Sequence, residues 1–207
     1  MFSMARTSNS AARRAQIVGA LQSVMARHGY ERATVQAIAA EAGLAPGLVH
    51  YHFKNKQEIL VSLVATLAEV GQARFAHLVG AASEPEARLR AWIEARLGLG
   101  DGAAPEVVAA WVMIGAEAVR QSEVREAYGR AVAAELALLA GLLADCLRQR
   151  GRPAQEADTE ARLLAAGVLA LMEGAYQLAC AAGEVMPRGY AAEAALRHAM
   201  LGIGARP

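Results

Sequence analysis

Apolar residues recur along most of this chain at the three- and four-residue spacing of amphipathic helices. The first such segment spans residues 11–28 and ends at Gly29, a natural helix stop. Two short segments and one long segment follow, and then five more. The predicted helices after the first are 35–42, 46–52, 56–79, 84–97, 105–121, 122–150, 154–182 and 188–202.

Composition favours the same fold class. Hydrophobic residues make up 55% of the 207 residues and charged residues 20%, which is typical of a globular chain. Ala and Leu dominate the apolar share, while the β-branched and aromatic residues that strands prefer are sparse. The sequence therefore predicts an all-α protein.

The segment between residues 11 and 56 has the signals of a helix-turn-helix. Thr34 is placed to cap the helix at 35–42, Gly43 ends it, and Pro46 occupies the first position of the next helix. Asn55 and Glu58 resemble a capping box at the start of the long helix. We expect a disordered arm over 1–10, a three-helix DNA-binding domain over 11–56, and a larger helical effector-binding and dimerisation domain over 57–207.

Charge is distributed unevenly along the chain. The formal net charge is only +1, but residues 1–56 carry seven Lys or Arg against two Glu, which leaves the remainder at −4. A basic N-terminal module indicates a polyanionic partner, although chance alone can produce such an imbalance. Whether Arg6, Arg13 and Arg14 touch DNA or are merely solvated stays open.

The second short helix would enter the major groove, with cationic and hydrogen-bonding groups beside it to hold phosphates. Both lysines of the chain lie at this point. Lys56 also begins a helix, where backbone N–H groups favour an anion. The candidates near bases are Pro46, Gly47, Leu48 and His50, and those near phosphates are Thr34, Tyr51, His52, Lys54 and Lys56.

The stretch "ATVQAIAAEAGLAPGLVHYHFKNKQEIL", residues 33–60, resembles the DNA-binding signature of the TetR family of bacterial transcriptional regulators. The resemblance implies phosphate contacts for Thr34, Tyr51, His52 and Lys56. Three positions depart from the usual pattern, which commonly has a Ser or Thr cap, a Thr and a first Tyr where this chain has Ala45, Leu48 and His50. Few polar groups remain to read bases, so Leu48 can contact a thymine methyl while DNA shape supplies the remaining specificity.

The predicted helix at 154–182 is apolar nearly all round, so it must be covered on two sides. One cover is the core of its own domain, and the other is a second copy of the chain, which with the helix at 188–202 would complete a four-helix dimer interface. The segment "ALMEGAYQLA", residues 170–179, is similar to the BetI-like subgroup of the TetR family.

The family resemblance implies a small-molecule effector that enters the larger domain, tilts the long helix starting near Lys56, and spoils the spacing of two recognition helices. Polar or aromatic groups on otherwise apolar helices are the pocket candidates. The competing explanation is ordinary core packing for Trp111, Met113 and Met172, and solvation or pairing across the dimer for Glu117 and Glu173. They are Trp92, Trp111, Met113, Glu117, Met172, Glu173, Tyr176 and Gln177. A pocket-facing Glu173 would favour a cationic ligand.

Other chemistry finds little support. No catalytic or phosphate-loop motif occurs, and the glycines of Gly98–Gly102 neither follow a strand nor open a dinucleotide-binding helix. His50 and His52 point apart on a helix, so we expect no metal site and no cofactor. Cys146 and Cys180 are expected to be buried thiols. No signal peptide or membrane span is expected, which favours a cytoplasmic protein.

The sequence therefore predicts a homodimeric helix-turn-helix transcriptional regulator, more a repressor than an activator, that leaves a palindromic double-stranded DNA operator when a small molecule binds. It is not expected to be an enzyme. The alternative is a helical small-molecule carrier or scaffold protein that does not bind DNA.

Overall fold

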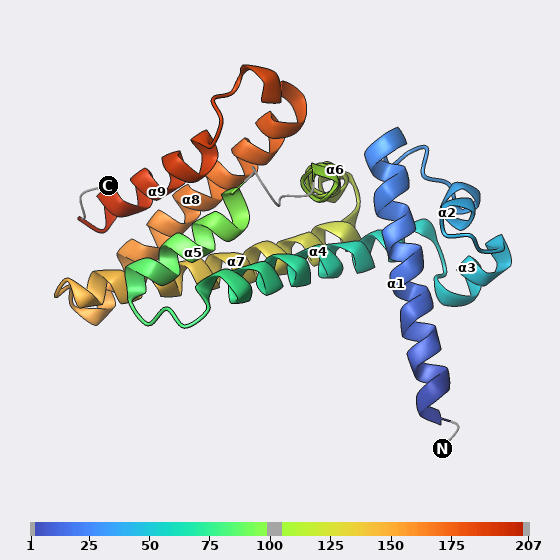
Figure 1. Cartoon of the computed structure of the whole chain (residues 1–207), viewed down its shortest axis with the longest axis horizontal. Coiled ribbons are helices and arrows are strands. Elements are labelled where there is room, and N and C mark those ends of the chain that lie inside the picture. The colour runs from blue at the N-terminus through green and yellow to red at the C-terminus, as the bar shows by residue number, and fades with distance from the viewer. Residues whose placement is uncertain (1–2, 99–104, 205–207) are drawn as a thin grey trace. The chain divides into compact units, whose positions relative to one another are not determined.

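A computed structural model of the chain describes residues 3–98 and 105–204 (Figure 1). All regular structure among these residues is helical, which confirms the all-α prediction. The helices are α1 (Ser3–His28), α2 (Val35–Glu41), α3 (Pro46–His52), α4 (Lys56–Val79), α5 (Pro85–Leu97), α6 (Pro105–Arg120), α7 (Ser122–Gln149), α8 (Ala154–Ala182), the short 3₁₀ helix η1 (Gly183–Val185) and α9 (Tyr190–Gly202).

The helices form two compact units. The first unit comprises Met1–Leu67 with Glu106–Gly129, and the second comprises Ala68–Pro105 with Arg130–Pro207. Both α4 and α7 begin in the first unit and end in the second. The units group residues by their contacts and not by chain order, so the functional domains at 11–56 and 57–207 remain predictions.

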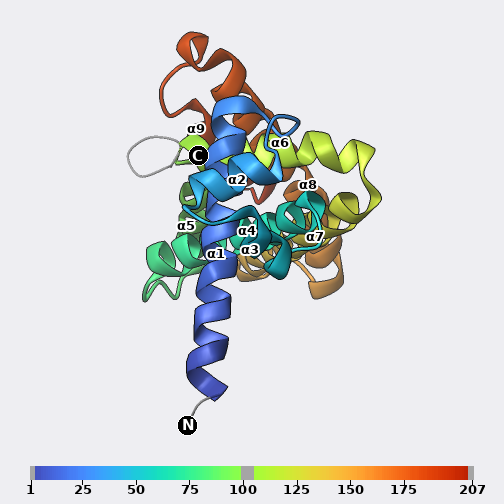
Figure 2. The same cartoon turned by 90° about the vertical axis from the view of Figure 1, so that its right-hand side faces the viewer.

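In the first unit, α1 packs against α2 and α3, and α2 packs against α3 (Figure 2). The apolar faces that the sequence pattern predicts are buried there. Fully burying one such side chain stabilises the fold by about 1.5 to 3 kcal/mol. The core side chains are Ile17, Leu21 and Met25 of α1, Ile38 and Ala39 of α2, Val49 of α3, Phe53 after it, and Ile59, Leu60, Leu63, Val64 and Leu67 of α4.

Two helix starts differ from the sequence prediction. The helix α1 begins at Ser3, so residues 3–10 are helical and not a disordered arm. Neither Gly nor Pro occurs in that stretch to interrupt the helix. At the other end, α9 begins at Tyr190, two residues later than expected, because Pro187 and the left-handed Gly189 (φ +72°) form a turn before it.

In the second unit, α8 packs along α9, and α5 packs against both helices. Glycines allow the close approach of α8 and α9: a Cβ on Gly167 would lie 2.8 Å from Nε2 of His198, and one on Gly202 would lie 2.3 Å from a methyl of Leu164. The inner face of α8 is buried. The outer face leaves leucines exposed, namely Leu163, Leu171 and Leu178, with Leu201 of α9.

The two cysteines lie in different surroundings. Cys146 is fully buried, as expected, and burial raises the pKa of its thiol to about 11. Cys180 is exposed, so the expectation of a buried thiol is wrong there. It lies in the last turns of α8, where residues 177–181 are all exposed because none of the elements that the structure describes covers them.

Two of the described helical segments are long and apolar enough to cross a membrane by length and composition alone. They are Lys56–Val79 and Ala154–Val185, with mean hydropathies of 1.4 and 1.5. Core helices of soluble proteins pass the same test, and both segments contribute buried side chains to a core, so this observation is weak evidence for a membrane span.

Candidate nucleic-acid interface

The turn between α2 and α3 has the geometry that its sequence predicts. The Thr34 hydroxyl oxygen accepts a hydrogen bond from the backbone N–H of Ala37 at 3.1 Å, which confirms the N-cap of α2. Gly43 adopts φ +64°, a left-handed conformation that favours glycine. The chain then turns back, and the N–H of Leu44 donates to the carbonyl of Ala39 at 2.9 Å. This compact turn places α3 directly after α2.

The helix α3 has one anchored side and one exposed side. Val49 is 1% exposed and Phe53, just after the helix, is 2% exposed, so both fix α3 to the core. Ala45 provides no side-chain cap at its start. Of the residues predicted to approach bases, Pro46, Gly47 and His50 are exposed and Leu48 is half-buried.

Aromatic and imidazole groups lie at the end of α3. The side chain of Tyr51 is 79% exposed, which makes it one of the most exposed large apolar groups among the described residues. Its ring meets the ring of His52 edge to face, with centroids 5.1 Å apart. Both rings therefore lie on the same end of the helix, where a phenol O–H and an imidazole N–H can donate to one anion.

The start of α4 carries a modified capping box. The Asn55 side-chain oxygen accepts from the N–H of Glu58 at 2.8 Å, as the sequence predicts. The Glu58 carboxylate returns to the N–H of Lys54, one residue before the expected Asn55. The backbone of Lys54 is thereby fixed while its side chain remains exposed.

Lys56 has a different environment from Lys54. Its ammonium donates to the Tyr30 carbonyl at 2.8 Å and lies 4.0 Å from the centroid of the Tyr30 ring. Burial raises the pKa of the Tyr30 phenol, and a hydrogen bond with Gln121 offsets part of that rise. An ammonium has three donors, so this contact leaves Lys56 chemically able to bind an anion as well.

The predicted effector residues divide between the two units. Trp111, Met113 and Glu117 belong to the first unit. There Trp111 packs on Tyr128 with ring centroids 4.9 Å apart, and buried Glu117 accepts a hydrogen bond from Gln121 at 2.6 Å. The other five belong to the second unit and are Trp92, Met172, Glu173, Tyr176 and Gln177.

Within the second unit, two of these candidates meet at Arg96. The Tyr176 hydroxyl donates to the Arg96 carbonyl at 2.8 Å, and the Arg96 guanidinium lies 5.4 Å from the centroid of the Trp92 ring. Trp92 is fully buried, and its indole N–H meets no acceptor among the residues that the structure describes. Met172 is buried, Glu173 is half-buried and Gln177 is exposed.

A separate hollow of about 510 Å³ lies between α7 and the start of α8. Most of its wall is made of alanine and glycine, and charged groups stand at one end. The lining residues are Ala133, Leu136, Ala137, Ala140, Gly141, Ala144, Arg148, Asp158 and Arg162. None of the predicted effector residues is among them.

Two family models match this chain. Residues 17–63 match bacterial regulatory proteins of the tetR family, and residues 85–203 match the C-terminal part of BetI-type transcriptional repressors. The second match alone spans more than half of the 207 residues. The chain belongs to the TetR family. As a TetR-family member with a BetI-like C-terminal part, it is a DNA-binding transcriptional regulator.

Curated relatives agree with this assignment. The HTH-type transcriptional regulator BetI of Rhizobium meliloti (strain 1021) is 32% identical over 167 residues, which cover 79% of this chain and 76% of that protein. The fatty acid metabolism regulator protein of Bacillus subtilis (strain 168) is 46% identical over 48 residues, covering 23% of this chain and 25% of that protein.

Solved structures share the fold of this TetR-family chain. A transcriptional regulator from Rhodococcus sp. Rha1 matches 92% of this chain and 96% of its own, with a TM-score of 0.76 at 23% identity. A regulator from Saccharomonospora viridis, solved in complex with choline, gives the same coverage and TM-score at 19% identity.

The sequence did not predict the ion pair that this TetR-family chain buries in its second unit. Nε and Nη2 of Arg96 donate to the two oxygens of Glu135 at 3.1 and 2.6 Å, and Nη1 donates to the carbonyl of Gly71 at 2.5 Å. Each of the two residues is one of several charged residues on its helix, so neither stood out in the sequence. The positions of Arg96 and Glu135 in the sequence do not indicate that the two charges meet.

Proposed function

We propose that this chain acts as a homodimeric repressor whose two α3 helices read the half-sites of a palindromic operator. The observation that carries the proposal is the exposure of α3. Val49 and Phe53 anchor its inner side, while Pro46, Gly47 and His50 face solvent, so the helix can enter a major groove without unfolding any core.

Phosphate contacts are assigned to the groups that surround α3. Four of these groups lie at or just after the C-terminal end of α3, namely Tyr51, His52, Lys54 and Lys56. The fifth, Thr34, lies at the start of α2. The Thr34 oxygen accepts from Ala37, and its O–H hydrogen can still donate to a phosphate. These contacts hold the register of α3, while Leu48 and His50 meet base edges and DNA shape supplies further selectivity.

The exposed leucines of α8 and α9 form the proposed dimer face. Leu163 is 78% exposed and Leu201 is 62% exposed, although both lie on helices whose other faces are packed. A second copy that covers these side chains would remove apolar surface from water and complete a four-helix interface.

We assign the effector site to the surroundings of Trp92 in the second unit. The buried indole N–H of Trp92 meets no acceptor in the described part of the chain, which is uncommon in folded proteins, and a ligand oxygen would satisfy it. Glu173 and the ring of Tyr176 on α8 would suit a small cation. The choline held by the Saccharomonospora viridis regulator makes choline the first compound to test.

The effector would act through α4. This helix is continuous from the first unit to the second, so a shift of its C-terminal half changes the start of α4 next to α3. The ligand releases DNA only if it binds the released state more tightly than the bound state. We place the protein in the cytoplasm, without membrane insertion or enzymatic activity.

The decisive experiment selects bound duplexes from a random DNA pool with the purified protein. The proposal expects a palindrome with half-sites about one helical turn apart, and its release by choline but not by 3,3-dimethylbutan-1-ol, the neutral isostere. A helical carrier or scaffold would select no sequence. If a palindrome is selected but no small molecule releases it, the proposed effector site is wrong and the proposed regulatory function stands.

A further inference from the structure

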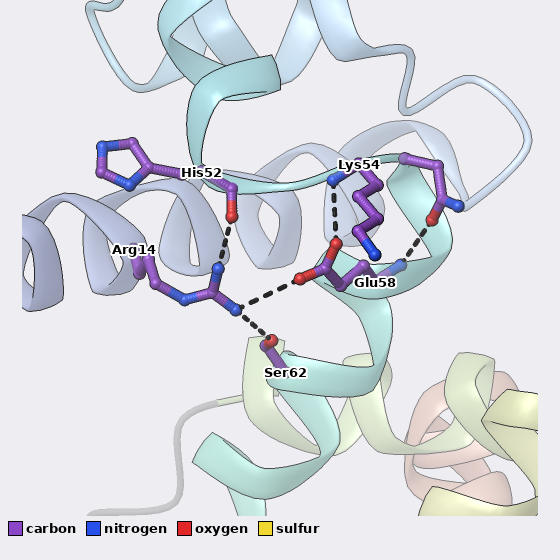
Figure 3. Close-up of polar contacts among 6 residues, drawn as sticks. Arg14, His52, Lys54, Glu58 and Ser62 are labelled. Carbon is purple, nitrogen blue, oxygen red and sulfur yellow. Dashed lines mark hydrogen bonds and ion pairs between the residues drawn. The ribbon is translucent and has the colours of Figure 1, made fainter.

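Arg14 of α1 contacts the end of α3 and the start of α4 with one guanidinium (Figure 3). Nη1 donates to the carbonyl oxygen of His52. Nη2 lies 3.5 Å from the Ser62 hydroxyl and 3.6 Å from the Glu58 carboxylate. The guanidinium carbon also lies 3.9 Å from the centroid of the Phe53 ring. Four groups separated from Arg14 by 38 or more residues therefore meet it.

The His52 carbonyl is a group that needs such a partner. It is the last carbonyl of α3. The last four carbonyls of a helix accept no hydrogen bond from the helix's own backbone. A positive charge at this end is also favoured by the helix dipole. Arg14 supplies both the donor and the charge, from a different helix.

A helix of seven residues depends on contacts at its ends for its direction, because so short a helix is marginal on its own. At its start, Ala45 gives no side-chain cap. At its end, Arg14 fixes the final carbonyl and stacks on the ring of Phe53, the residue that follows. Arg14 therefore adds a polar anchor at the C-terminal end of α3 to the apolar anchoring by Val49 and Phe53.

The same cluster fixes the link between α3 and α4. One Glu58 oxygen faces Arg14, and the other accepts from the N–H of Lys54 at 2.8 Å. Figure 3 shows Glu58 between Arg14 and Lys54. Arg14 thus also supports the backbone of Lys54, a proposed phosphate contact.

We propose that Arg14 is a positioning residue for DNA recognition, which sets the orientation of α3 against α1 and α4 without contacting DNA itself. The inference rests on the proposed use of α3 as the recognition helix. Its consequence is a loss of selectivity on substitution: the operator, which needs α3 in one orientation, loses more affinity than an unrelated duplex, which needs only charge.

Arg13 is the matched control. It is the adjacent arginine on α1, it is exposed, and its described hydrogen bond goes to Gln16 one turn away on the same helix at 2.8 Å. Arg13→Ala removes the same charge from the neighbouring position of α1 and leaves the contacts between Arg14 and α3 intact.

The test measures binding of the selected operator and of an unrelated duplex over a range of salt concentrations, for the wild type, Arg14→Ala, Arg14→Lys and Arg13→Ala. For Arg14→Ala we expect the operator-to-unrelated affinity ratio to fall about tenfold, as for one lost base contact, with an unchanged salt slope. The affinity ratio of Arg14→Lys should lie between those of the wild type and Arg14→Ala, since one ammonium cannot reach all the acceptors. Equal losses on both duplexes with a slope shallower by about 0.9 would show a phosphate contact and overturn the proposal.

Hydrogen exchange of the DNA-free protein gives a second readout. In Arg14→Ala the amides of residues 47–56 should exchange at least severalfold faster than in the wild type, while Arg13→Ala leaves them unchanged, both measured well below the melting temperature. Unchanged exchange in Arg14→Ala would overturn the positioning role. If the wild type binds no duplex, the proposed function fails, and the exchange result still decides whether Arg14 holds α3.

Discussion

Arg96 and Glu135 face each other as a bidentate pair in the interior of the second unit, with side chains only 7% and 11% exposed. Removing one partner leaves the other charge buried and unpaired. We therefore expect Glu135→Ala to lower the free energy of unfolding by about 3 to 5 kcal/mol, measured by urea denaturation.

The exposed pair Arg197–Glu193, on α9, is the control for that change. Its side chains are 61% and 70% exposed, so Arg197→Ala should change the free energy of unfolding by about 0.5 kcal/mol or less. The double change Arg96→Met with Glu135→Leu should recover most of the stability. Equal small losses at both pairs would contradict the buried-pair account.

The turn before α3 gives a second prediction. Gly43 has φ +64°, so Gly43→Ala should cost about 1 to 2 kcal/mol of unfolding free energy. Gly47→Ala lies within α3, where an added Cβ meets nothing within 4 Å, and it should be neutral or add up to about 1 kcal/mol. Thermal and urea unfolding measure both. A Gly43→Ala protein as stable as the Gly47→Ala protein would mean that residue 43 does not adopt a left-handed conformation in the turn.

The buried thiol of Cys146 makes stability depend on pH. Burial raises its pKa to about 11 from 9.0, so the unfolded thiol loses its proton first as pH rises. The unfolded state then binds fewer protons, and the contribution of Cys146, complete below pH 9.0, is lost between pH 9.0 and about 11. The slope is at most about 1.4 kcal/mol per pH unit.

Cys146→Ala isolates this effect from other groups that titrate at high pH. The variant has a lower free energy of unfolding because the sulfur is missing, and this loss does not depend on pH. The difference in unfolding free energy between the wild type and the variant should therefore narrow as pH rises from 9 to 10.5. A gap that stays constant across that range would show that Cys146 ionises as readily in the folded protein as in the unfolded one.

The leucines on the outer face of α8 test the dimer. Leu163→Glu should shift the protein toward monomers in sedimentation and weaken operator binding, because a charge would be buried in the interface. Val185→Glu is the control, since Val185 is 80% exposed but lies in η1 and outside that face. If Leu163→Glu remains dimeric, the second copy binds elsewhere.

Much of the fold was predictable because helical periodicity and the stop and cap residues are local signals. The predicted bounds of α3 and α4 match the structure, and Thr34 caps α2 as expected. Pro46 and Gly43 carry their conformational preferences within the residue itself. Such signals do not depend on the rest of the chain.

Contacts between distant residues were not predictable. Arg14 belonged to a stretch that the sequence left as either DNA-binding or solvated, and the structure places it on His52, Glu58 and Ser62. Arg96 and Glu135 likewise meet only after the helices pack. A single sequence carries helix periodicity, but it does not record which charges the packing brings together. The exposure of Cys180 was missed because it too depends on how the helices pack.

The salt dependence of operator binding tests the central claim most directly. The logarithm of the affinity for the selected palindrome should fall linearly with the logarithm of salt concentration, and Lys54→Ala should make the slope shallower by about 0.9 while weakening every duplex alike. A protein that shows no preference for any duplex over another at any salt concentration would contradict the account.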